Sequence, residues 1–171
     1  QNEKFGKVPH PMQKQTPYNL INHAPLLIVE PNKDLRIKIA KAFQRSGLRL
    51  ISVGSGEDAL NVVRGFGVPA LAVIELALPD MSGLELASRL KQARTIPIIM
   101  SGYNISPDTV ASMLDLVAED FVQKPYDEQE LAARVYRILL RSSKAMPAVE
   151  EATVGRVRKK DFLRGDFKLA Q

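Results

Sequence analysis

The chain of 171 residues contains no cysteine, so neither disulfide bonds nor thiolate metal sites are available to it. No apolar run is long enough to cross a bilayer, and residues 1–20 lack the apolar segment of a signal peptide. Neither G-x-G-x-x-G nor G-x-x-x-x-G-K-[S/T] occurs, so nucleotide-phosphate loops have no support. These absences favour a cytoplasmic chain with no membrane partner. Its first residue is Gln rather than Met, which favours a fragment or a processed form.

The net charge of +5 lies mainly at the two ends. Residues 26–144 carry 15 Lys and Arg against 14 Asp and Glu, whereas both flanks have a basic excess. A nearly neutral middle argues against a domain that reads DNA. We expect a flexible Pro-rich arm at 1–23, one folded domain at 24–144, and a basic linker or the start of a following segment at 145–171.

Short apolar runs alternate five times with amphipathic segments of helical period. This alternation predicts a parallel sheet with helices on both faces, and the chain is too short for an eight-unit barrel, which needs roughly 250 residues. The fold class is therefore an open, doubly wound α/β sheet. The expected strands are 26–29, 48–53, 71–75, 96–100 and 121–123. Expected helix starts are Pro31 as a first helical residue and Ser55, Ser82, Ser106 and Asp127 as caps; the first helix is expected to close at Gly47.

Four polar residues stand where expected strands end: Glu30, Glu75, Ser101 and Lys124. The carboxyl ends of parallel strands meet at one edge of a sheet, which is where open α/β sheets bind ligands. Two carboxylates, a hydroxyl and an ammonium suit a divalent metal with a phosphoryl group. A salt bridge without further function is the alternative.

Five stretches carry a resemblance to a known family: LLIVEPN, GSGEDAL, VIELALPDMSGLEL, IPIIMSGY and EDFVQKPYDEQELAARV. They resemble the receiver domain of bacterial response regulators, the CheY-like family of two-component systems. The resemblance implies a flavodoxin-like (βα)5 fold with strand order 2-1-3-4-5. It also implies phosphorelay signal transduction, in which a sensor kinase phosphorylates an aspartate after the third strand. The resemblance further implies that an acidic pair helps to hold Mg²⁺ at this site. A hydroxyl residue and an aromatic residue would report the modification.

Several residues depart from that pattern. Glu75 stands at the phosphoacceptor position, and its extra methylene displaces the carboxylate by up to roughly 1.5 Å, which spoils in-line geometry. The acidic pair is Glu30-Pro31, so a metal would have only Glu30, and Mg²⁺ is disfavoured as a cofactor. Either Ser101 or Gly102 fills the switch position, with Ser101 favoured because Ser-Gly-Tyr matches the family's hydroxyl followed by a small residue.

Phe121 and Lys124 keep the places that the resemblance assigns to the aromatic reporter and the phosphate-binding lysine. With the other positions altered, we interpret the domain as a pseudo-receiver: a non-enzymatic, phosphorylation-independent module that acts through protein–protein interaction or dimerisation. We also expect Lys124 to contact Glu75 directly, as a permanent substitute for the phosphorylated state.

Two alternatives remain. The receiver could still be phosphorylated at Glu75 or regulated by Mg²⁺, or the basic flanks could contact nucleic acid. The expected partner is another protein or an attached output domain. A homodimer could form through the helix after Ser106, the strand at 121–123 and the helix after Asp127. On that last helix the basic stripe of Arg134, Arg137, Arg141 and Lys144 is interpreted mainly as a solvated face.

Overall fold

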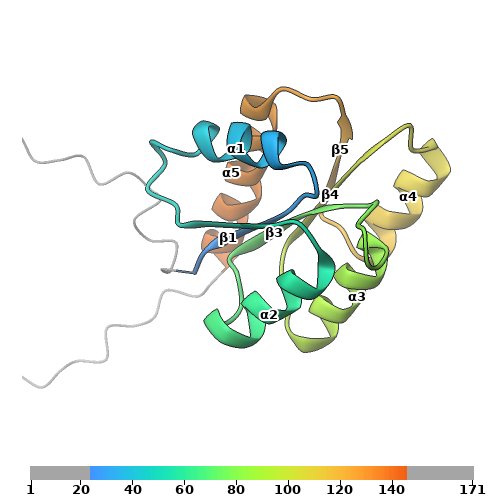
Figure 1. Cartoon of the computed structure of the whole chain (residues 1–171), viewed down its shortest axis with the longest axis horizontal. Helices are drawn as coiled ribbons and strands as arrows, with labels where there is room; N and C mark the ends of the chain where they lie inside the picture. The colour runs from blue at the N-terminus through green and yellow to red at the C-terminus, as the bar shows by residue number, and fades with distance from the viewer. Residues whose placement is uncertain (1–23, 146–171) are drawn as a thin grey trace, which may run out of the picture.

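The computed structural model describes residues 24–145, in which parallel strands alternate with helices (Figure 1). The strands pair in the order β2-β1-β3-β4-β5, so the order reverses between β1 and β3. The predicted flavodoxin-like doubly wound sheet is therefore confirmed. The arm expected at 1–23 and the linker expected after the last helix lie outside the described residues. The strands are β1 (Leu26–Val29), β2 (Leu50–Val53), β3 (Leu71–Glu75), β4 (Ile98–Tyr103) and β5 (Asp120–Lys124).

The helices begin at capping side chains, most of which the sequence predicted. Ser55, Ser82 and Ser106 each accept a hydrogen bond from a backbone N–H in the first turn that follows. The prediction for Pro31 was wrong, because Asn32 is the cap and Pro31 precedes it. The helices are α1 (Lys33–Ala42), α2 (Gly56–Phe66), α3 (Gly83–Ala93), α4 (Pro107–Leu116) and α5 (Glu128–Ala145).

The end of the first helix was also predicted wrongly. Helix α1 ends at Ala42, with Phe43 as its cap, instead of continuing to Gly47. Gly47 does have a positive φ of 74°, but it lies in the loop that leads to β2. Its left-handed conformation therefore serves a turn and not the helix end.

The core has two layers, one on each face of the sheet. Successive strand residues alternate between them, because the side-chain period of a strand is two. Leu26 and Ile28 of β1 face the layer formed with α1 and α5, whereas Leu27 and Val29 face the layer formed with α2, α3 and α4. Figure 1 shows the same division, with α1 and α5 on one side of the strands and the other helices on the opposite side. Both faces are thus covered, which explains the continuous apolar runs.

The start of α3 lies directly against the end of β3. A Cβ atom on Gly83 would lie 2.3 Å from the carbonyl oxygen of Glu75, far inside contact distance. Any larger residue would have to push the helix away from the strand. Glycine at this position therefore allows the close packing that fixes the backbone of Glu75.

Candidate functional site

An ion triad of Glu30, Glu75 and Lys124 lies at the carboxyl-end edge of the sheet. The Lys124 ammonium forms ion pairs with Oε2 of Glu30 and, at 2.5 Å, with Oε2 of Glu75. The three residues are only 4–5% exposed. The predicted contact between Glu75 and Lys124 is therefore confirmed. Both side chains of this ion pair are almost completely buried. That Glu30 shares the same ammonium was not predicted from the sequence.

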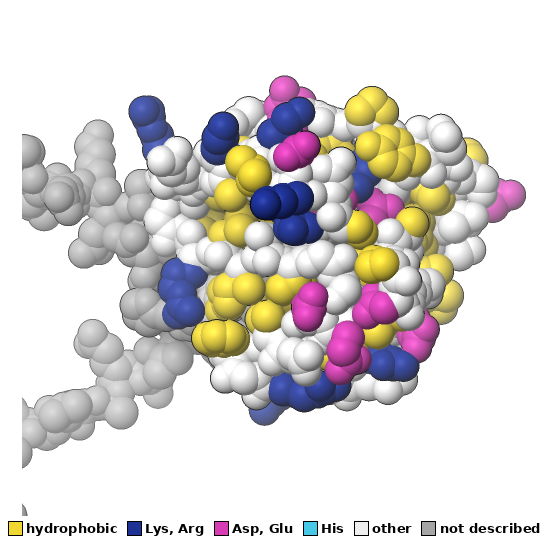
Figure 2. Space-filling model, viewed as in Figure 1, with side chains coloured by type: hydrophobic (Ala, Val, Ile, Leu, Met, Phe, Trp, Pro, Cys, Tyr) yellow, Lys and Arg dark blue, Asp and Glu magenta, His cyan; other side chains and the backbone are white. Residues whose placement is uncertain are grey.

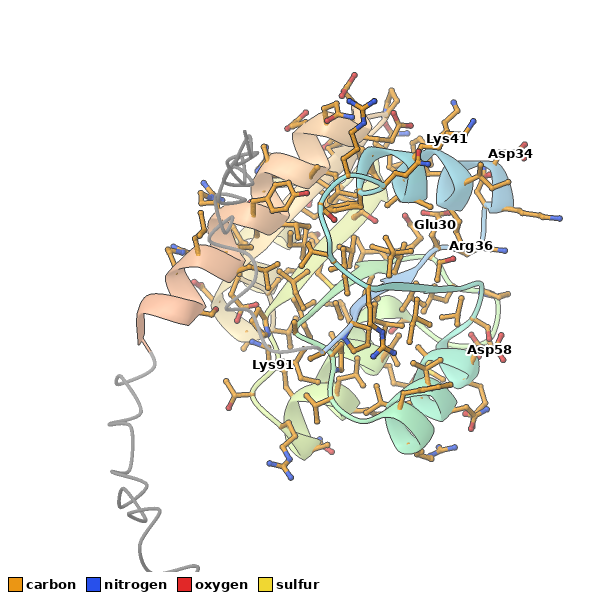
Figure 3. The ribbon with its side chains drawn as sticks, turned by 90° about the vertical axis from the view of Figure 1, so that its left-hand side faces the viewer. Glu30, Asp34, Arg36, Lys41, Asp58 and Lys91 are labelled. Carbon is orange, nitrogen blue, oxygen red and sulfur yellow. The ribbon has the colours of Figure 1, made fainter. Side chains whose placement is uncertain are left out.

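Both carboxylate oxygens of Glu30 have donors within the protein. Oε1 accepts the backbone N–H of Asn32 at 2.8 Å, and Oε2 accepts from Lys124. The guanidinium of Arg36 donates to the carbonyl oxygens of Glu30 and Pro31, at 2.6 and 3.0 Å. Figure 3 shows Glu30 and Arg36 close together where β1 leads into α1. Arg36 is thus a positioning residue for the loop that carries Glu30.

The Glu75 carboxylate is engaged in the same way. Oε1 accepts the backbone N–H of Ala77 at 3.1 Å, and Oε2 accepts the hydroxyl of Ser101 at 3.3 Å besides its ion pair with Lys124. Glu75 and Ser101 are paired residues on adjacent strands, which brings their side chains together. All oxygens of both carboxylates consequently accept from the protein itself.

The two candidates for the switch position lie in different surroundings. Ser101 is buried with its hydroxyl on Glu75, whereas Gly102 packs closely on the side chains of Leu76 and Ile105. Ser101 thus brings a hydroxyl to the carboxylate. Phe121 is half-buried and packs against the layer on the α2–α4 side. The structure brings Ser101 together with the triad, and the signalling roles of Ser101 and Phe121 stay predictions.

Two effects act in opposite directions on the Lys124 ammonium. Burial alone would lower the pKa of Lys124, but its hydrogen bonds and ion pairs with Glu30 and Glu75 raise that pKa above its ordinary value. The ammonium also lies 5.3 Å from the centre of the Tyr103 ring, a favourable cation–π arrangement. Lys124 is therefore charged at neutral pH and held from three sides.

The residues present do not fit the Mg²⁺ that the resemblance implies. Mg²⁺ requires several oxygen ligands in near-octahedral geometry. Glu30 and Glu75 are already bound to an ammonium, and Pro31 supplies no carboxylate. Within residues 24–145 no group of three or more His, Asp and Glu is arranged to hold a metal ion. A cation at this site would have to displace Lys124.

Asp80 is a residue of this region that sequence reasoning missed. Its two carboxylate oxygens accept the backbone N–H groups of Gly56 and Glu57, at 2.9 and 2.8 Å, and so cap α2 from the loop between β3 and α3. Hydrogen bonds from these two amides lower the pKa of Asp80. No periodicity links positions so far apart in the chain, so the sequence carried no signal for this contact.

The basic stripe on α5 is partly neutralised. Asp120 of β5 pairs with Arg134 at 3.0 Å and with Arg137 at 2.7 Å, and Arg134 also pairs with Glu130. The hydrogen bond to Glu130 is the main reason that the pKa of Arg134 is raised. Arg141 is exposed, while the side chain of Lys144 is not among those described. The stripe interpreted mainly as a solvated face therefore also forms ion pairs in its first half.

Comparison with known proteins gives a consistent match. The model of the response regulator receiver domain matches residues 26–136. The sensory transduction protein RegX3 of Mycolicibacterium smegmatis is 32% identical over 118 residues, which are 69% of this chain and 51% of the relative. The transcriptional regulatory protein PhoP of Bacillus subtilis, named for alkaline phosphatase synthesis, is 31% identical over 126 residues, 73% and 52% of the two chains. The chain thus spans about half the length of these curated relatives.

A solved structure gives the same result. The response regulator DrrB, described as a Thermotoga maritima OmpR/PhoB homolog, matches with a TM-score of 0.63 and 28% identity. The match covers 70% of this chain and 54% of that one.

Among the described residues, no helix is long and apolar enough to cross a membrane.

Proposed function

The chain belongs to the response regulator receiver family, and on that premise we propose that its described domain is a pseudo-receiver that signals without phosphorylation. The observation that carries this proposal is the occupation of the Glu30 and Glu75 carboxylates by protein donors. In a working receiver, as the resemblance implies, the lysine after the fifth strand is available to a phosphoryl oxygen. Here Lys124 is already bound by two carboxylates, so the site resembles a permanently paired state.

A phosphoryl acceptor must present an unencumbered carboxylate oxygen in line with the donor. Both oxygens of Glu75 accept from Ala77, Ser101 or Lys124, and attack would require breaking a buried ion pair. The pairing of these carboxylates and the ammonium with one another supports a signalling module over an enzyme. The alternative, a receiver still phosphorylated at Glu75 or regulated by Mg²⁺, would have to open the triad first.

We further propose that the output of this domain passes through protein contacts. The matched region covers only about half of each curated relative, and PhoP is by name a transcriptional regulator, which favours an attached output domain or a separate protein partner. Leu114 and Leu116 are 43% and 78% exposed, so α4, one of the elements proposed for a homodimer, carries exposed apolar side chains. The face shown in Figure 2 has acidic side chains among its basic ones, which does not favour nucleic acid as a partner of that face.

Phosphoryl analogues test the proposal directly. With Mg²⁺ and beryllofluoride, the amide spectrum and the sedimentation mass of the domain should stay unchanged, and acetyl phosphate should leave no adduct in intact-mass analysis. The matched comparison is the double variant Pro31→Asp with Glu75→Asp, which restores the acidic pair and a shorter acceptor. It should bind Mg²⁺ more tightly than the natural chain. A beryllofluoride-dependent change in the natural chain would favour the phosphorylated alternative.

A further inference from the structure

A half-open cavity of about 190 Å³ lies beside the triad, between the start of α1, the end of β4 and the loop from β5 to α5. It is distinct from the buried contacts of Glu30 and Glu75, because neither of these residues lines it. Lys124 forms part of its wall. The other polar and aromatic residues of the wall are Asn32, Asp34, Lys38, Tyr103, Tyr126 and Glu128.

The charges around this cavity do not balance. Asp34 and Glu128 are acidic and Lys38 is basic, and none of the three forms an ion pair with another described residue. Lys124, which is itself part of the wall, offsets only one of its two carboxylate partners, Glu30 and Glu75, which do not line the cavity. The cavity and its immediate surroundings therefore have an excess of negative charge, which favours a cation.

The aromatic residues of the wall add to this preference. Tyr103 is 57% exposed, so much of its ring remains accessible although Lys124 approaches it at 5.3 Å. Tyr126 is half-buried in the wall. Burial raises the pKa of Tyr126, and the negative charges of Glu30, Glu75 and Glu128 raise it further. Aromatic faces together with carboxylates are a favourable environment for an organic ammonium ion.

We propose that this cavity binds a small organic ammonium group. Its volume is below the roughly 300–1,000 Å³ of ordinary ligand pockets, so the bound group has few heavy atoms. A metal ion is a poorer occupant, because residues 24–145 contain no cluster of three or more ligating side chains suited to one. The ammonium could belong to a free amine or to a lysine side chain of a partner protein. This inference does not depend on the phosphorylation state of the family site.

Titration of the full chain with 1,4-diaminobutane tests the proposal, with amide chemical shifts and calorimetry as readouts. Shift changes should cluster at Asp34, Tyr103 and Glu128. Asp34→Asn or Glu128→Gln should each weaken binding about fivefold, because one nearby unit charge is removed. Lys38→Gln should strengthen binding by a similar factor, since it removes a like charge. This increase is not expected from a merely structural role.

Asp115→Asn is the matched control, because Asp115 is an exposed acid on α4, away from the cavity wall. It should change the affinity by less than twofold. The tripeptide acetyl-Gly-Lys-Gly-amide distinguishes the sources: tighter binding than the diamine indicates a partner's lysine, and weaker binding indicates a free amine. Equal binding of glutarate, displacement by Mg²⁺ at the same concentration, or no response to Lys38→Gln would overturn the proposal.

Discussion

Two carboxylate–cation networks in this domain have similar chemistry but different surroundings. In the triad, the side chains of Glu30, Glu75 and Lys124 are about 5% exposed. In the network of Asp120 with Arg134 and Arg137, the exposed fractions are 14%, 32% and 58%. Water can replace a lost partner in the second network but not in the first. Burial, more than the number of ion pairs, should therefore decide how much each network matters.

The largest expected effect is that of Lys124→Met. It leaves two buried carboxylates without their cation, and the free energy of unfolding should fall by about 3–5 kcal/mol. Chemical denaturation at neutral pH measures this loss. The matched control is Lys91→Met, which removes the 2.9 Å pair with Glu119, a pair whose side chains are 28% and 30% exposed; about 1 kcal/mol or less is expected there. Equal losses in the two variants would contradict the distinction between the networks.

The dependence of this effect on pH has a defined sign. Because the pKa of Lys124 is raised in the folded domain, the stabilisation is fully present below the ordinary lysine pKa and is lost as the pH rises through the folded value. The difference in stability between the natural chain and Lys124→Met should thus shrink in alkali. The raised pKa of Tyr126 also makes the free energy of unfolding fall as the pH rises. The variant Tyr126→Phe removes this contribution and so separates it from that of Lys124.

A smaller effect is expected for Glu75→Gln, which leaves Lys124 paired with Glu30. About 2 kcal/mol should be lost, the value of a hydrogen bond to a charged group. In a Lys124→Met background the same substitution should be neutral or stabilising, because it then removes an unpaired buried charge. A double-mutant cycle measures this coupling. Equal costs in both backgrounds would show that Glu75 acts independently of Lys124.

The smallest effect is expected at the exposed network. Asp120→Asn should lower the free energy of unfolding by about 0.5–1 kcal/mol, and most of that loss should disappear in 1 M salt. Glu130→Gln, which removes only the i,i+4 pair with Arg134, should cost less than about 0.5 kcal/mol. A salt-independent loss of several kcal/mol at Asp120 would show that this network behaves like the buried one.

Much of the fold could be predicted because it depends on local patterns. Apolar runs covered on both faces, and caps such as Ser55 and Ser106, are visible in the sequence and were confirmed. The contact of Glu75 with Lys124 could be predicted because parallel strands bring their ends to one edge. The predicted start at Pro31 failed since Asn32, the better capping side chain, competed with it one residue later.

The remaining features depend on side-chain reach across the sheet. That Glu30 shares the ammonium of Lys124, or that Arg36 holds the carbonyls of the same loop, follows from three-dimensional distances for which no spacing rule exists. The close packing at Gly83 is a further feature of this kind, because the partner atom lies on another element. Its contact atom, the carbonyl of Glu75, emerged only from the structure.

The hydrogen bonds from Gly56 and Glu57 to Asp80 limit how the length of the loop between β3 and α3 can vary among related proteins. Surface loops normally tolerate insertions and deletions. The loop between β3 and α3 is held at Ala77 by Glu75 and at Asp80 by the first amides of α2. Adding or removing one residue between these two points would break one attachment or the other. We therefore expect homologous sequences that keep both contacts to keep this loop at constant length.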